Sequence, residues 1–137
     1  MSTRGAAFCL IYARDTKRFL MELRGSNVGN PLTWGFVGGG VEEHESFEDA
    51  MRRELREEAG LDVRFFDGVM RSRKSMSIFI KILDHEFDPV LSFESESWRW
   101  CDELPQLRLH PKIRKQAESI NRVLELLRTR TTRRTSK

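Results

Sequence analysis

One helix-forming segment set among short strand-forming segments limits this chain to few folds. Residues 46–60, SFEDAMRRELREEAG, are predicted to form a helix, with Ser46 as its N-terminal cap and Gly60 as its stop. Apolar residues recur in this segment at intervals of four, which is the pattern of a helix with one buried side. They are Phe47, Met51 and Leu55.

Apolar runs bounded by turn residues predict strands on both sides of this helix. The predicted strands are residues 5–13, 18–24, 33–37, 61–70, 75–84 and 97–101. A second helix is predicted to begin at Pro111, with an apolar face formed by Ile113, Ala117, Ile120, Leu124 and Leu127. This order predicts an α/β (or α+β) sandwich, in which a mixed β-sheet lies between the central helix and a C-terminal helix.

Composition narrows the class of protein. With 137 residues, of which 39% are hydrophobic and 33% charged, the chain fits one globular domain, and no apolar run approaches the length of a membrane span. The short apolar run at residues 6–13 fits a strand better than a secretion signal, so a cytoplasmic protein without membrane contact is expected. Cys9 and Cys101 are too few for a disulfide framework and are expected to be buried free thiols.

The positive charge of the chain is concentrated at its C-terminal end. Residues 128–137, RTRTTRRTSK, hold five basic residues and no acidic one, which leaves 19 basic and 21 acidic residues in the rest of the chain. We therefore expect a domain over residues 1–127 and a basic, disordered tail over residues 128–137. Weak contact of this tail with nucleic acid is the minor alternative.

Three glutamates crowd one side of the predicted central helix. Glu54, Glu57 and Glu58 lie at positions i, i+3 and i+4, within an arc of about 100°. Like charges at this spacing repel, so either neighbouring arginines, as in the pair Arg53–Glu57, or a bound cation must compensate them. Three glycines, residues 38–40, precede the helix and are predicted to form a turn that brings backbone close to a ligand. A Mg²⁺–polyphosphate site and a solvated, salt-bridged helix are both compatible with this pattern.

The segment 39–61 also resembles a known signature. It is similar to the box of the Nudix hydrolases, which runs glycine, five free positions, glutamate, seven free positions, then Arg-Glu-apolar-any-Glu-Glu-any-Gly-apolar. Every fixed position is matched, by Gly39, Glu45, Arg53, Glu54, Leu55, Glu57, Glu58, Gly60 and Leu61. A match this long at fixed spacing is highly specific. The resemblance implies the Nudix fold and hydrolysis of a nucleoside diphosphate that is linked to some other group.

The resemblance also implies roles for the residues of the box. Glu54, Glu57 and Glu58, together with the carbonyl of Gly39, are expected to hold Mg²⁺ or Mn²⁺. Glu57, Glu58 or a glutamate outside the box is expected to position or deprotonate the attacking water. Arg53 is expected to orient the carboxylates, and Glu45 to support the start of the helix.

The substrate-binding residues are predicted from fewer signals. Arg24 is expected to meet a phosphate, and Glu94 to supply a further ligand or base. Trp34 is expected to lie closer to the substrate than Trp98 and Trp100, which are assigned to packing. A nucleoside triphosphate or a nucleotide sugar is the favoured small-molecule substrate. An RNA 5′-polyphosphate hydrolase and a catalytically silent nucleotide-binding module are the alternatives, and a homodimer is left open.

Overall fold

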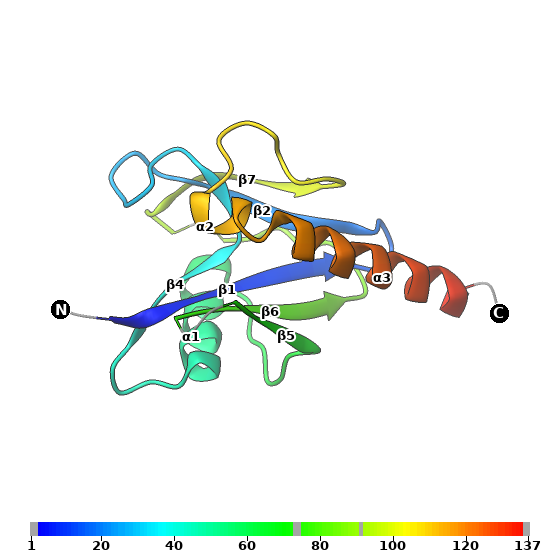
Figure 1. Cartoon of the computed structure of the whole chain (residues 1–137), viewed down its shortest axis with the longest axis horizontal. Helices are drawn as coiled ribbons and strands as arrows, with labels where there is room; N and C mark the ends of the chain where they lie inside the picture. The colour runs from blue at the N-terminus through cyan, green and yellow to red at the C-terminus, as the bar shows by residue number, and fades with distance from the viewer. Residues whose placement is uncertain (1–2, 73–74, 91, 136–137) are drawn as a thin grey trace.

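The computed structural model describes residues 3–72, 75–90 and 92–135. Within these residues the chain forms a mixed sheet of seven strands, with α1 on one face and the C-terminal helices on the other (Figure 1). The strands are β1 (Thr3–Ala13), β2 (Arg18–Arg24), β3 (Trp34–Gly35), β4 (Val37–Glu42), β5 (Gly68–Ser72), β6 (Met76–Leu83) and β7 (Ser95–Cys101). The helices are α1 (Phe47–Ala59), α2 (Pro111–Arg114) and α3 (Ala117–Thr135).

The long strand β1 organises the sheet. It pairs in parallel with β6, and it pairs antiparallel with β4 over its first part and with β2 at its end. Strand β2 in turn pairs antiparallel with β3 and β7, and β5 lies outside β6. This register places Gly39 of β4 opposite Ala7 of β1, and Glu22 of β2 opposite Trp98 of β7.

Two hydrophobic layers separate the sheet from its helices. The layer beneath α1 includes Ile11, Leu20, Met51, Leu55 and Trp100. The layer beneath α2 and α3 includes Phe8, Tyr12, Phe36, Ile113, Ile120, Leu124 and Leu127. Each fully buried side chain of this size contributes about 1.5–3 kcal/mol of transfer free energy. The predicted sandwich is therefore confirmed, and Cys9 and Cys101 are buried free thiols as expected.

Glycines 38–40 do not form the predicted turn. They lie inside β4, where they pair with β1. Gly38 has a φ of 155°, and a Cβ at this position would lie 2.1 Å from the carbonyl oxygen of Ala7. The prediction of a turn was wrong because these glycines allow two strands to approach closely, rather than allowing the chain to reverse.

The strand predicted at residues 61–70 is wrong for most of its length, since β5 begins only at Gly68. The chain leaves α1 through Gly60, and its next apolar side chains pack without forming a ladder. Val63 is buried in the layer beneath α1, and the ring of Phe66 lies 4.8 Å from that of Phe79. Apolar residues that cover a sheet and apolar residues that extend it give the same sequence pattern.

The C-terminal helix is interrupted at Lys115 and Gln116, which separate α2 from α3. Helix α3 continues to Thr135, so residues 128–135 are helical where a disordered tail was predicted, and residues 136–137 of the predicted tail lie outside the described residues. Arg128 ties this part of the helix to the domain, because its guanidinium donates hydrogen bonds to the carbonyls of Lys17 and Asp102. Among the described helices, none has the length and apolar character required to cross a membrane.

Candidate active site

Helix α1 turns two of its three clustered glutamates toward the protein interior. Both ends of the helix are fixed: Ser46 Oγ accepts a hydrogen bond from the amide of Asp49 at 3.0 Å, and Gly60 adopts the left-handed conformation. These are the cap and stop that the sequence predicted. Glu54 and Glu58 are buried, whereas the side chain of Glu57 is 60% exposed.

Arg53 links α1 to the segment that precedes it. Its guanidinium donates hydrogen bonds to both carboxylate oxygens of Glu45, at 2.7 and 2.9 Å, and to the carbonyl of Gly40 at 3.2 Å. It also reaches the carboxylates of Glu54 at 3.4 Å and Glu57 at 3.5 Å. The two-pronged hydrogen bond from Arg53 lowers the pKa of Glu45 to about 2. Arg53 thus fixes the positions of these three carboxylates relative to strand β4.

Gly39 allows strand β4 to lie directly against the carboxylate of Glu54. A Cβ added at Gly39 would lie 2.6 Å from Glu54 Oε2, a distance that real side chains do not tolerate. Glycine at this position lets the Glu54 carboxylate lie where it does, and an added Cβ would push that carboxylate aside. The backbone of β4 and the Glu54 carboxylate are thus in close contact.

Four carboxyl groups from three segments meet beside α1. Glu54 and Glu58 come from α1, Glu22 comes from β2, and Glu94 comes from the loop before β7. The side chain of Glu58 lies beside those of Glu54, Glu94 and Glu22. The hydroxyl of Ser95 donates a hydrogen bond to Glu22 Oε1 at 3.2 Å. We refer to Glu22, Glu54, Glu58 and Glu94 as the carboxylate cluster.

The carboxylate cluster lacks enough positive charge to balance it. Burial raises the pKa of Glu22 and of Glu58, and the neighbouring carboxyl groups raise the pKa of Glu58 further. Among the ion pairs that the described residues form, none includes Glu22 or Glu58. Buried carboxylates in contact with one another take up protons or a cation, because charging all of them uncompensated is too costly.

The donor atoms of the cluster fit a hard divalent cation. Mg²⁺ and Mn²⁺ prefer carboxylate and carbonyl oxygens, and Mg²⁺ keeps several waters and completes its shell with substrate phosphates. In the part of the chain that the structure describes, no three His, Cys, Asp or Glu side chains are already arranged to hold a metal ion. Glu54, Glu57 and Glu58, with the Gly39 carbonyl, would share the cation with water and phosphate.

Strand β4 also borders a cavity of about 220 Å³ toward α2. Its lining contains two cationic side chains and no acidic one: Gly5, Ala6, Phe8, Arg24, Asn30, Gly39, Gly40, His110 and Lys112. Arg24 is held there by a hydrogen bond of 2.6 Å from its Nε to the carbonyl of Gly29. The cavity is suited to an anionic or acceptor-rich ligand that reaches Gly39 from the side opposite the carboxylates.

His110 gives this cavity a neutral hydrogen-bonding group. The Nδ1 atom of His110 accepts a hydrogen bond from the amide of Lys112 at 3.1 Å, so the proton of the neutral ring lies on Nε2. Nε2 faces the side-chain amide of Asn30 at 3.4 Å. Burial, together with the charges of Arg24 and Lys112, lowers the pKa of His110 to about 4. His110 is therefore uncharged at neutral pH.

The three tryptophans have different surroundings. Trp100 is buried beneath α1, where its Nε1 donates to the carbonyl of Phe87 at 3.1 Å, and Trp98 packs against the same layer. The packing role predicted for these two residues is confirmed. Trp34 is half-buried, and the guanidinium of Arg99 lies 4.6 Å from the centre of its ring. Trp34 is not one of the residues that line the cavity beside Gly39.

Sequence reasoning missed Glu22, Asn30, His110 and Lys112. No motif contains them, and they reach the site only through the pairing of strands and the packing of α2. One feature of the sequence does point to Glu22. It is the acidic residue within the otherwise apolar run FLMEL of a predicted strand, and it falls on the same face as the buried Leu20.

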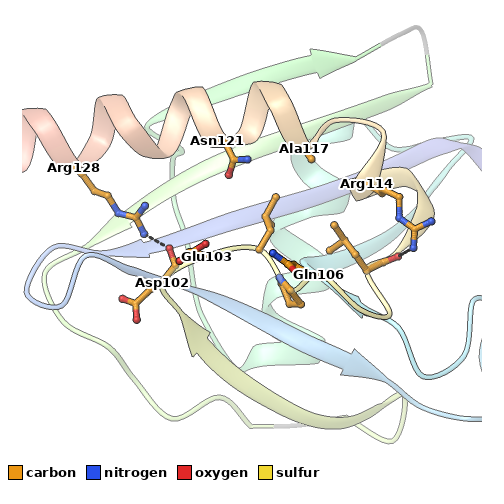
Figure 2. Close-up of a pocket in the computed structure, with 10 residues that line it drawn as sticks. Asp102, Glu103, Gln106, Arg114, Ala117, Asn121 and Arg128 are labelled. Carbon is orange, nitrogen blue, oxygen red and sulfur yellow. Dashed lines mark hydrogen bonds between the residues drawn. The ribbon is translucent and has the colours of Figure 1, made fainter.

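A larger hollow, of about 490 Å³, lies between α3 and residues 102–109, on the opposite face of the sheet from the carboxylate cluster (Figure 2). At one end Arg128 donates a hydrogen bond of 2.6 Å to the carbonyl of Asp102. At the other end Arg114 donates to the carbonyl of Leu109. Both guanidinium groups are thus hydrogen-bonded to backbone carbonyl groups. Asp102 and Glu103 add negative charge, so this lining specifies no single class of ligand.

Comparison with known proteins identifies relatives in sequence. A family model for the NUDIX domain matches residues 2–123. Over 102 residues the chain is 36% identical to the dihydroneopterin triphosphate diphosphatase of Escherichia coli (strain K12), which covers 72% of this chain and 65% of the relative. The matched part is thus slightly under two thirds of that protein. A shorter match, 40% identical over 52 residues, covers 38% of this chain and 37% of the nucleoside triphosphatase NudI of Escherichia fergusonii.

Solved structures share the fold. The Nudix hydrolase RenU from M. smegmatis superposes with a TM-score of 0.72 at 23% identity, covering 90% of this chain and 87% of that one. The E. coli dihydroneopterin triphosphate pyrophosphohydrolase gives a TM-score of 0.56 at 28% identity, covering 72% of this chain and 80% of that one. With its signature intact on α1 and the family match extending over 122 of its residues, from 2 to 123, this chain belongs to the Nudix family.

Proposed function

We propose that this protein is a divalent-metal-dependent hydrolase that cleaves a phosphoanhydride bond of a nucleoside triphosphate or a closely similar triphosphate. The observation that carries the proposal is the burial of two neighbouring carboxylates: Glu54 lies against Gly39 of the glycine strand, and Glu58 forms no ion pair with any described residue. A fold does not bury carboxylates in mutual contact for stability alone, because each costs free energy to desolvate. Retaining them is understandable if they bind a cation.

The reaction assigned to these residues is attack of water on a phosphorus atom. A bond forms between the water oxygen and phosphorus, the bridging P–O bond breaks, and the leaving phosphate or pyrophosphate takes the bridging oxygen. Bound Mg²⁺ or Mn²⁺ would neutralise phosphate charge and make water more acidic. Glu57 or Glu58 accepts the proton that water gives up, and Arg53 keeps the carboxylates of Glu54 and Glu57 in place.

The cavity toward α2 supports the choice of a nucleotide-like substrate. Arg24 and Lys112 supply charges that suit phosphate, and Phe8 and the neutral His110 supply an apolar wall and a hydrogen-bonding group that suit a heterocycle. The relatives named for nucleoside triphosphate and dihydroneopterin triphosphate hydrolysis favour a triphosphate over a nucleotide sugar. Arg24 is proposed to bind phosphate, and Glu94 to assist Glu58.

The test is product identification over a panel of substrates with Mg²⁺. The panel contains nucleoside triphosphates, a pterin triphosphate, nucleotide sugars and RNA with a 5′-triphosphate. We expect a monophosphate and pyrophosphate from a small triphosphate, with no turnover when the metal is chelated. Preferred hydrolysis of the RNA would instead support the RNA-directed alternative, in which the basic C-terminal residues contact the nucleic acid. Binding without hydrolysis of any substrate would identify a silent module.

A further inference from the structure

Glu22 is an acidic residue in a place where a strand of this sheet otherwise carries apolar side chains. It is 5% exposed, and its neighbour on the same face, Leu20, is buried beneath α1. Its side chain lies on the face of the sheet that packs beneath α1, next to the side chain of Glu58. Glu22 belongs to no part of the Nudix box, since it lies 17 residues before Gly39, the first residue of that box.

The fold alone gives little reason for this carboxylate. Its neutral partner is the hydroxyl of Ser95, which donates at 3.2 Å. Among the described residues, no lysine or arginine forms an ion pair with Glu22. A leucine or glutamine at this position would avoid the cost of desolvating a carboxylate beside another carboxylate.

The position of Glu22 suggests what it does. Glu58 is buried on the side of α1 that packs on the sheet, and Glu22 is buried on the side of the sheet that packs beneath α1, so the two side chains meet between helix and sheet. Cations are held most firmly when oxygens surround them from more than one side. The residues of the Nudix box supply oxygens from α1 and from the neighbouring strand β4 only.

We propose that Glu22 supplies a carboxylate to the divalent-cation site from the sheet side, opposite Glu58, either as a direct ligand or through a bound water, and that Ser95 orients it. This inference rests on the proposed function, because it assigns a further binding residue to the same site. The site then draws on three elements, so β2, β4 and α1 must be held together for the cation to bind. Glu22 is then a cation-binding residue rather than a group that attacks the substrate.

The experiment measures metal binding directly and not only turnover. Free Mn²⁺ is followed by electron paramagnetic resonance during titration of the full chain, for the wild type and for Glu22→Gln, Glu58→Gln and Glu118→Gln. Glutamine keeps the shape of the side chain and can still accept the Ser95 hydrogen bond, but it removes the charge. Glu118→Gln is the matched control, because Glu118 is exposed on α3, on the other face of the sheet.

We expect Glu22→Gln to weaken Mn²⁺ binding by about 10- to 100-fold, the range seen when residues that support metal ligands are removed. The rise in melting temperature that Mg²⁺ produces should shrink in parallel, while the metal-free melting temperature stays the same or rises. Glu118→Gln should bind Mn²⁺ like the wild type. Ser95→Ala is a second variant that leaves the carboxylate in place, and it should weaken binding less than Glu22→Gln.

Each outcome bears on the proposal. Wild-type Mn²⁺ affinity in Glu22→Gln, with lost affinity in Glu58→Gln, overturns the role of Glu22 and leaves the proposed function standing. Absence of Mn²⁺ and Mg²⁺ binding by the wild type overturns the proposed function itself. If Glu22→Gln fails to fold, Ser95→Ala decides: weaker Mn²⁺ binding supports the role of Glu22, and unchanged binding overturns it.

Discussion

Replacing Glu45 with glutamine tests how α1 is tied to the segment that precedes it. The carboxylate of Glu45 receives two hydrogen bonds from the guanidinium of Arg53, at 2.7 and 2.9 Å. The side chain of Glu45 is 11% exposed and that of Arg53 is 25% exposed, so water reaches the pair only in part. Glutamine retains one acceptor oxygen but loses the charge and the second acceptor.

The size of the effect follows from the pKa of Glu45, which falls from 4.5 to about 2 in the folded protein. Each pKa unit corresponds to about 1.4 kcal/mol, so the pair contributes about 3 kcal/mol at most. Solvent screening at the exposed edge of Arg53 reduces this to about 1–2 kcal/mol. For a domain of this size, that loss lowers the melting temperature by about 3–6 °C.

The sign of the pH dependence is fixed by the direction of the shift. Because the pKa is depressed on folding, the stabilisation is fully present above 4.5 and is lost as the pH falls through about 2. Urea midpoints of the wild type and Glu45→Gln should therefore differ at neutral pH and converge as the solution is acidified. Glu48→Gln is the control, because Glu48 pairs with Arg52 at a surface position that is 51% exposed and should change little. A loss that is equal for both variants, or constant with pH, would refute this account of the Arg53 contact.

Three further predictions concern single side chains. Gly39→Ala should lower Mg²⁺ affinity and turnover by about 10-fold or more, because its Cβ would displace the Glu54 carboxylate, whereas Gly29→Ala should be neutral because nothing lies within 4 Å of it. Trp100→Ala should cost about 3–5 kcal/mol in denaturant unfolding, as expected for emptying a core site that also loses the Phe87 hydrogen bond, and a loss below about 1 kcal/mol would mean that the site is not core. In an NMR titration of the folded protein, His110 should protonate near pH 4. The neutral ring therefore stabilises the fold fully above pH 6.5, and this contribution is lost as the pH falls through about 4. A titration midpoint near pH 6.5 would contradict the burial of His110.

Local signals made the central helix predictable. Ser46, Gly60 and the stripe formed by Met51 and Leu55 act within the helix itself, and the structure contains each of them as the sequence indicated. Residues 38–40 and 61–67 were mispredicted because their conformation depends on partners elsewhere in the chain. The sequence gives no local signal that a glycine allows close approach of a neighbouring strand, or that an apolar residue covers a face of the sheet rather than extending it.

The same contrast between local signals and distant contacts applies to the candidate site. Helical spacing brings Glu54, Glu57 and Glu58 together wherever the helix lies, so their grouping could be predicted. Spacing does not say which of them faces the interior, and only the packing of α1 on the sheet separates the exposed Glu57 from the buried Glu58. Glu22 and His110 join the site through strand register and through the docking of α2, which no periodicity in the sequence encodes.

The central claim is that the buried carboxylates are kept for a cation and not for the fold. Glu58→Gln tests it most directly, through two measurements on one variant: the melting temperature without metal and the Mg²⁺-dependent turnover. Glu58 is buried among other carboxyl groups, so the neutral glutamine should leave the metal-free protein as stable as the wild type or more stable. Turnover on the best triphosphate should fall by about 10³-fold or more, since the variant loses a metal-binding oxygen. Near-wild-type turnover in this variant, or a large loss of metal-free stability with turnover preserved, would contradict the account.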